Sequence, residues 1–140
     1  MGKIFKLNRL IVLFIGIGLL VLSFEIYLMH YDQLAVKKIM WTPVIFGSIG
    51  GLSVILISII FNRISYYLFL IVMGLSACVG FLGLYLHNRW RFPAIINTLF
   101  FHKPFDFEIL TTYTPLLAPS AFIAIGGLGV LIALFERWDY

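Results

Sequence analysis

The stretch RLIVLFIGIGLLVLSFEIYLMH, residues 9–30, decides the fold of this chain. Between Arg9 and His30 it contains one charged side chain, Glu25, among residues that are almost all apolar. A helix needs about 20 predominantly apolar residues to cross the hydrocarbon core of a bilayer. The run exceeds the roughly 7–15 apolar residues of a secretory signal peptide, and no cleavage-site pattern follows it. We therefore predict a transmembrane helix.

The composition of the whole chain supports this interpretation. Of its 140 residues, 62% are hydrophobic and 11% are charged, whereas about 25% of the residues in soluble domains are charged. The net charge of +4 is dispersed between apolar runs, so it does not predict binding to nucleic acid. The single cysteine, Cys78, excludes an intrachain disulfide and a cysteine-based metal cluster. We predict an all-α integral membrane protein surrounded by lipid.

Four apolar runs are long enough to span the bilayer, and they predict a single membrane domain, residues 1–140, folded as a four-transmembrane-helix bundle. The predicted spans are residues 10–29, 43–61, 65–86 and 115–135. Tryptophan and tyrosine residues lie near the ends of these runs, as is typical at the membrane–water interface. Because small residues mark contacts between membrane helices, we expect packing seams in the last three spans. These seams are Gly47, Gly51 and Ser58; Ser76, Gly80 and Gly83; and Ser120, Ala124 and Gly127.

The first span offers Gly16 and Gly18 and otherwise large residues, so we expect it to be peripheral or to face a partner. Basic flanking residues predict its orientation, because cytoplasmic loops are enriched in Lys and Arg and the first span usually dominates. Lys3, Lys6 and Arg9 precede it, although basic residues of the whole chain divide evenly between the two sides. We predict that both termini are cytoplasmic.

The two halves of the chain share an ordered series of short motifs. The first half has YLMH, WTP, IGGLSV and FNR, and the second has YLH, YTP, IGGLGV and FER. Two related helical hairpins, forming a parallel pseudo-twofold repeat, would produce this pattern. Chance recurrence of Gly, Leu and Ile in an apolar chain is the alternative. In a true repeat, His30 and His87 are counterparts on the same side of the membrane.

His30 and His87 are the candidate cofactor-binding residues. His87 shares a helical face with Gly80 and Gly83, and His30 shares one with Ser23 and Ile26. Two neutral imidazoles from facing helices can ligate haem b or another metal, or bind a quinone. The alternative is that both rings are ordinary interfacial helix ends, since no CxxCH or HExxH motif is present.

Glu25 is the candidate for a proton or ion path, because ionisable residues within a span are often functional. It would line such a path or pair with Arg89 or Arg91. The alternative is that Glu25 lies close enough to the interface to reach water or stays protonated.

The segment 88–112 is a long aromatic loop on the outer side, with residues 92–101 expected to form a short interfacial helix. We expect partner or lipid contacts from Arg89, Trp90, Arg91 and His102. His102, Asp106 and Glu108 could join His30 and His87 as ligands of a divalent metal, but their spacing matches no defined motif and the metal is unknown. A simple polar rim is the favoured alternative.

The chain resembles a family of small bacterial four-transmembrane-helix proteins that has no established activity. The shared motifs are MWTP at 40–43, YLHNR at 85–89, Asn97, LAP at 117–119 and GGLG at 126–129. The chain departs from the family pattern after His87, where RWRFP replaces a glycine-rich turn. The resemblance implies the four-span fold and assigns no functional residue.

Three hypotheses for function remain open. The leading one is a non-enzymatic subunit, anchor or scaffold of a larger membrane assembly, in contact with lipid and with other membrane subunits or copies of itself. The second is a redox membrane component that binds haem b or quinone through His30 and His87. The third is a small-solute or proton carrier centred on Glu25.

Overall fold

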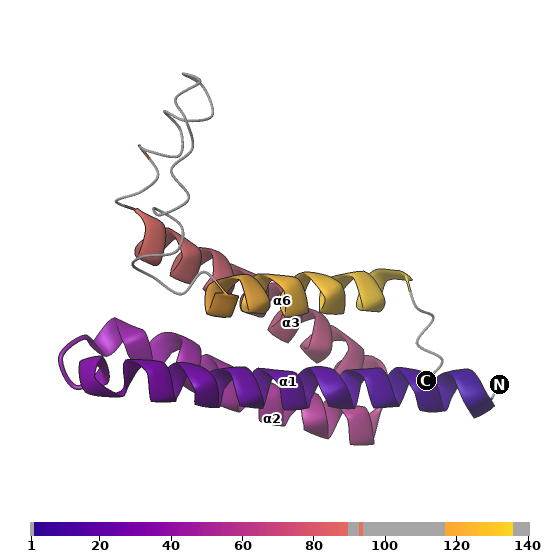
Figure 1. The fold of residues 1–140 in the computed structure, drawn as a ribbon. Coiled ribbons are helices and arrows are strands. Elements are labelled where there is room, and N and C mark those ends of the chain that lie inside the picture. Colours follow the sequence, from indigo (N-terminus) through magenta and orange to yellow (C-terminus); the bar gives the residue numbers. More distant parts are fainter. Residues whose placement is uncertain (1, 90–92, 94–116, 136–140) are drawn as a thin grey trace.

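The computed structural model describes residues 2–89, 93 and 117–135 (Figure 1). Side chains are described from Asn8 onward within these ranges, apart from Leu117. The described residues form four long helices, α1 (Gly2–Leu34), α2 (Trp41–Ile60), α3 (Arg63–Asn88) and α6 (Leu117–Phe135), with one short 3-10 helix, η1 (Lys38–Met40). All four long helices are long and apolar enough to cross a membrane. The predicted four-helix membrane fold is confirmed.

The first helix is longer than the apolar run that predicted it. Residues Asn8–Leu34 meet the length and hydropathy of a span, and 27 residues of helix measure about 40 Å. The polar residues after His30 therefore end the apolar run without ending the helix. Helix α1 begins and α6 ends at the same end of the bundle (Figure 1).

The helices associate as two hairpins. Contacts are most extensive between α1 and α2 and between α3 and α6, and they are much sparser between α2 and α3 and between α1 and α6. His30 and His87 are 57 residues apart. Several buried positions of α1 have a buried counterpart on α3 at this same offset. Val12, Leu19 and Ser23 on α1 correspond in this way to Phe69, Ser76 and Gly80 on α3, and all six are buried. The internal repeat stays a prediction that this pattern supports.

Glycines bring the backbones of α1 and α2 together. A Cβ atom at Gly51 would lie 2.9 Å from the carbonyl oxygen of Gly16, and one at Gly16 would lie 2.9 Å from that of Gly51. Farther along, a Cβ at Gly47 would meet the Cβ of Ser23 at 2.8 Å. The expectation that the first span is peripheral is wrong, because Gly16 gives α1 a surface on which α2 packs closely.

The α3–α6 contact also depends on glycines. A Cβ at Gly80 would lie 2.7 Å from the backbone nitrogen of Ile123, and one at Gly126 would lie 2.5 Å from that of Ala77. Gly129 receives the side chain of Met73. Neither Gly80 nor Gly126 has room for a methyl group.

The predicted seam of α6 is wrong. Ser120 and Ala124 are exposed, and no described residue lies within 4 Å of a Cβ built at Gly127. The helix is rotated so that the neighbouring face, which carries Phe122 and Gly126, turns inward. Phe122 is 1% exposed and packs near the ring of Phe46, while Gly126 lets the backbone of α6 approach that of α3. Such close contacts between membrane helices favour the observed rotation.

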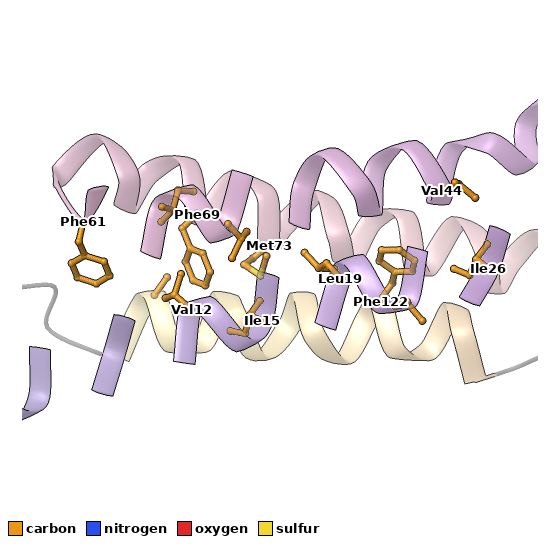
Figure 2. Packing of buried hydrophobic residues seen from close by; sticks show 13 residues of the cluster. Val12, Ile15, Leu19, Ile26, Val44, Phe61, Phe69, Met73 and Phe122 are labelled. Carbon is orange, nitrogen blue, oxygen red and sulfur yellow. The ribbon is translucent and has the colours of Figure 1, made fainter. Parts of the chain in front are cut away.

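Large apolar side chains fill the space between the hairpins (Figure 2). Phe69 and Met73 from α3 lie near Val12 and Leu19 from α1, and Phe122 from α6 lies farther along the same row. The rings of Phe46 and Phe122 approach to 6.2 Å between centroids, which joins α2 to α6. The core therefore contains residues from all four helices.

Buried serines link helices by hydrogen bonds. The Ser23 hydroxyl donates to the carbonyl oxygen of Val44 at 2.6 Å and lies 2.8 Å from the Ser48 hydroxyl. The Ser76 hydroxyl donates to the carbonyl oxygen of Phe122 at 3.2 Å. Such bonds between membrane helices contribute about 0.6 kcal/mol on average. They add to the glycine contacts within each hairpin.

The outer surface of the bundle is apolar on all four helices. Large apolar side chains such as Phe14, Ile49, Ile71 and Leu131 are more than half exposed. Contiguous apolar surface of this extent is not found on a soluble monomer. The four helices therefore fit a protein embedded in a membrane.

Replacing adjacent glycines of α6 tests the packing of the second hairpin. Gly126→Ala should lower the free energy of unfolding by about 1–3 kcal/mol, because its methyl group would collide with the backbone of α3. Gly127→Ala should stay within about 1 kcal/mol of the unchanged protein, because its methyl group meets open space. Unfolding by sodium dodecyl sulfate in mixed micelles, followed by circular dichroism, measures both. Equal losses in the two variants would contradict this packing.

Candidate functional site

Two histidines from different hairpins meet at one end of the bundle. The rings of His30 on α1 and His87 on α3 lie 5.8 Å apart between centroids, with their planes inclined by 55°. The two helices are not otherwise among the extensively packed pairs. The approach of the two imidazoles expected from the sequence is therefore present, while ligand binding by the pair stays a prediction.

The helical repeat explains why the rings meet. His30 lies four residues after Ile26 and seven after Ser23, and both of these residues are buried. His87 lies seven residues after Gly80. A side chain at Gly80 would collide with α6, so this face of α3 is packed. Separations of four and seven residues keep side chains on one face of a helix. Each imidazole thus extends a packed face of its helix, and the two faces meet at the ring pair. Each ring is half-buried.

A backbone hydrogen bond fixes the tautomer of His30. Its Nδ1 atom lies 3.0 Å from the carbonyl oxygen of Ile26, one helical turn earlier. A carbonyl oxygen only accepts hydrogen bonds, so Nδ1 carries the proton. In the neutral ring this leaves the lone pair on Nε2. Metal-binding histidines typically show this arrangement, in which one ring nitrogen donates to a carbonyl and the other binds the metal.

The spacing of the two rings matches shared coordination of one metal ion. With metal–nitrogen bonds of roughly 2 Å, two imidazoles on one ion have centroids about 4.5–6.5 Å apart, depending on the angle at the metal, and the observed separation falls within this range. Within residues 2–89 and 117–135, no group of three or more His, Cys, Asp or Glu side chains could hold a metal. The pair therefore supplies two ligands, and further ligands would come from a porphyrin, water or other residues.

Asn88, which follows His87 in the sequence, has a side-chain hydrogen-bond acceptor that no described residue uses. Its Nδ2 group donates to the carbonyl oxygen of Leu84 at 2.9 Å. Among the described residues, its Oδ1 atom has no hydrogen-bond partner although it is buried, and the residue is only 4% exposed. A buried acceptor without a donor costs about 1–3 kcal/mol. A ligand or water at this end of the bundle would relieve that cost.

The sequence did not single out Asn88 as a site residue. The available signal was an amide side chain directly after His87, but a helix C-terminus is an ordinary place for asparagine. Its burial arises from packing between helices. Only the folded chain shows that one of its two polar atoms is left without a partner.

Glu25 lies apart from the two histidines. It is exposed on α1, among exposed apolar residues that include Val21, Phe24 and Leu28. The structure therefore does not place Glu25 in the interior of the bundle. A path for protons or solutes centred on it would run along the outer surface of α1.

The remaining predicted site residues are only partly described. Arg89 is exposed at the end of α3. Trp90, Arg91, His102 and the predicted interfacial helix at residues 92–101 lie outside the described residues, Pro93 excepted. Their roles in partner or lipid contact stay predictions.

Comparisons of the chain with protein-family models, with curated proteins and with solved structures found no match. The resemblance to small four-span bacterial proteins thus rests on its motifs alone. The site has to be interpreted from its own chemistry.

Proposed function

We propose that this chain is an integral membrane protein that holds a metal ion between His30 and His87. The observation that carries the proposal is the pairing of the two rings across hairpins at 5.8 Å between centroids. The fixed tautomer of His30 supports it, because Nε2 is left as an electron-pair donor.

Two imidazole ligands favour some metal ions over others. Imidazole nitrogens suit iron, copper, zinc and nickel, whereas calcium and magnesium prefer oxygen ligands. Two sources share this chemistry, the iron of haem b and a free transition-metal ion, and His30 and His87 would supply imidazole nitrogens to either. Haem would make the protein an electron-transfer component. A free ion would point to metal storage, sensing or structural stabilisation.

The proposal includes a location for the site. We infer from Lys3, Lys6 and Arg9 before the first span that both termini are cytoplasmic, and from the resemblance to small bacterial four-span proteins that the membrane is a bacterial plasma membrane. The histidine pair would then lie at the outer face, since α1 and α3 both end there. A C-terminal reporter that is active only in the cytoplasm should be active when fused to this chain. Activity of a periplasmic reporter instead would reverse the orientation.

Metal content and optical spectra of the purified protein test the site. The full chain, purified in mild detergent from cells supplied with iron and a haem precursor, should carry close to one metal ion per chain. A haem would appear as a Soret band that shifts on reduction by dithionite, and a free ion would appear only in elemental analysis. His30→Ala and His87→Ala should each lower metal occupancy at least tenfold, because a single imidazole lacks the second ligand.

Gln33→Ala is the matched control, since Gln33 is an exposed residue of α1 close to His30. It should retain the occupancy of the unchanged protein. In metal-free protein, the nitrogen chemical shifts of His30 should report a proton on Nδ1. The proposal would be overturned if the unchanged protein carried no metal. It would also be overturned if the variant with both histidines replaced still carried metal.

Glu25 favours a second candidate function, a subunit or anchor of a larger membrane assembly. Its carboxyl group is exposed on α1 among apolar residues that face lipid. Charged groups at a lipid-facing position are costly, and the cost reaches about 2.5–3.5 kcal/mol for Asp at the centre of a span. A basic or polar group of a neighbouring membrane protein, or of a second copy, would relieve it. Association through this face of α1 is therefore favoured.

The size of the detergent-extracted particle tests this second function. The unchanged protein should run as a complex larger than one chain, and Glu25→Gln should shift much of it to the monomer. Asp32→Asn is the control, because Asp32 is exposed on the same helix but beyond the apolar run. A monomeric unchanged protein, or a Glu25→Gln protein of undiminished size, would contradict a Glu25-mediated assembly.

A further inference from the structure

A groove runs along the lipid-facing side of α2 where α3 diverges from it. Its volume is about 590 Å³. One end is formed by Lys38 of η1 with Trp41 and Thr42 at the start of α2, and the other end is formed by Gly50 and Ser53. Among the described residues, Val72 and Leu75 are the contribution of α3. The groove is separate from the histidine pair.

The way the hairpins meet creates this groove. Contacts between α2 and α3 are much sparser than those within either hairpin, and α3 runs obliquely to α2 (Figure 1). Gly50 adds to the space because it has no side chain, and a Cβ at that position would come within 3.4 Å of Val72. In a bilayer, the hydrocarbon of lipid is the available material to fill such an apolar space.

The length of the groove matches one leaflet of the bilayer. Trp41 and Ser53 are twelve residues apart on α2, which corresponds to about 18 Å of helix. Half of a typical hydrocarbon core is about 15 Å thick. The groove therefore extends from the headgroup level to slightly beyond the bilayer midplane, which is the depth that one acyl chain occupies.

The end at the headgroup level is basic and structurally fixed. Lys38 lines the groove, and both Lys38 and its neighbour Lys37 are exposed. The indole Nε1 of Trp41 donates to the carbonyl oxygen of Leu34 at 3.1 Å, and the Trp41 ring lies 6.3 Å from that of Tyr27. Tryptophan and tyrosine with lysine are typical of the interface, where a lysine attracts anionic lipid headgroups.

We propose that this groove binds one anionic phospholipid, with an acyl chain between α2 and α3 and the phosphate at Lys38. The apolar walls take the chain, and the single lysine at the mouth supplies charge complementarity. Neutral lipid would gain the acyl-chain contact without the ionic one. The groove therefore prefers anionic over zwitterionic headgroups on identical acyl chains.

Native mass spectrometry of the delipidated full-length protein tests the headgroup preference. Phosphatidylglycerol should bind as one retained molecule, more tightly than phosphatidylcholine with the same acyl chains. Lys38→Gln should weaken phosphatidylglycerol binding about fivefold, the effect expected for one lysine near an anionic lipid. Lys37→Gln should weaken it less, because Lys37 does not line the groove. Equal binding of both lipids, or equal effects of the two lysine variants, would overturn the proposal.

Filling the groove tests the position of the acyl chain. Gly50→Leu and Ser53→Leu should each prevent retention of phosphatidylglycerol, because their side chains would occupy the space of the chain. Gly127→Leu is the control, because a side chain there meets open space on α6. Folding of each variant is checked by circular dichroism. If one of the two filling variants fails to fold, the other still tests the position of the acyl chain. Retention of the lipid in a folded filling variant would also overturn the proposal.

Discussion

The close approach of helix backbones at glycine residues is the interaction on which the rest of this structure depends. In lipid, apolar side chains gain little by leaving one hydrocarbon environment for another, so helices associate through contact at short range and through hydrogen bonds. Gly16 and Gly51 allow such contact between α1 and α2, and Gly80 and Gly126 allow it between α3 and α6. The two hairpins are therefore the rigid units of the fold.

The histidine pair follows from how these two units meet. The hairpins share a core of large side chains, in which Phe69 and Phe122 are almost completely buried. This core sets the rotation of α1 and α3 about their axes, and that rotation directs His30 and His87 toward one another. Neither helix packs extensively on the other, so the site is positioned through α2 and α6.

Sparse packing between the hairpins has a second consequence. Where α2 and α3 contact one another less, the membrane has access to the space between them, and Gly50 enlarges it. The same weak contact that lets two histidines from separate hairpins converge thus leaves a lipid-sized groove elsewhere. Tight packing is concentrated within hairpins, and the features available for ligands lie between them.

The sequence by itself determined the class of protein, the four spans and the seams of α2 and α3, because apolar run length and the spacing of small residues are local properties of the chain. It also placed His30 and His87 on faces that could meet. The tertiary structure alone decided that Gly126 packs inward while Gly127 does not, that Gly16 makes α1 central, that Glu25 faces outward, and that the Oδ1 atom of Asn88 is buried with no partner in the part of the chain that the structure describes. Each of these depends on the rotation of a helix about its axis. In α6 two neighbouring rows of small residues were available, and the close packing of Phe122 and Gly126 against the other helices selected between them.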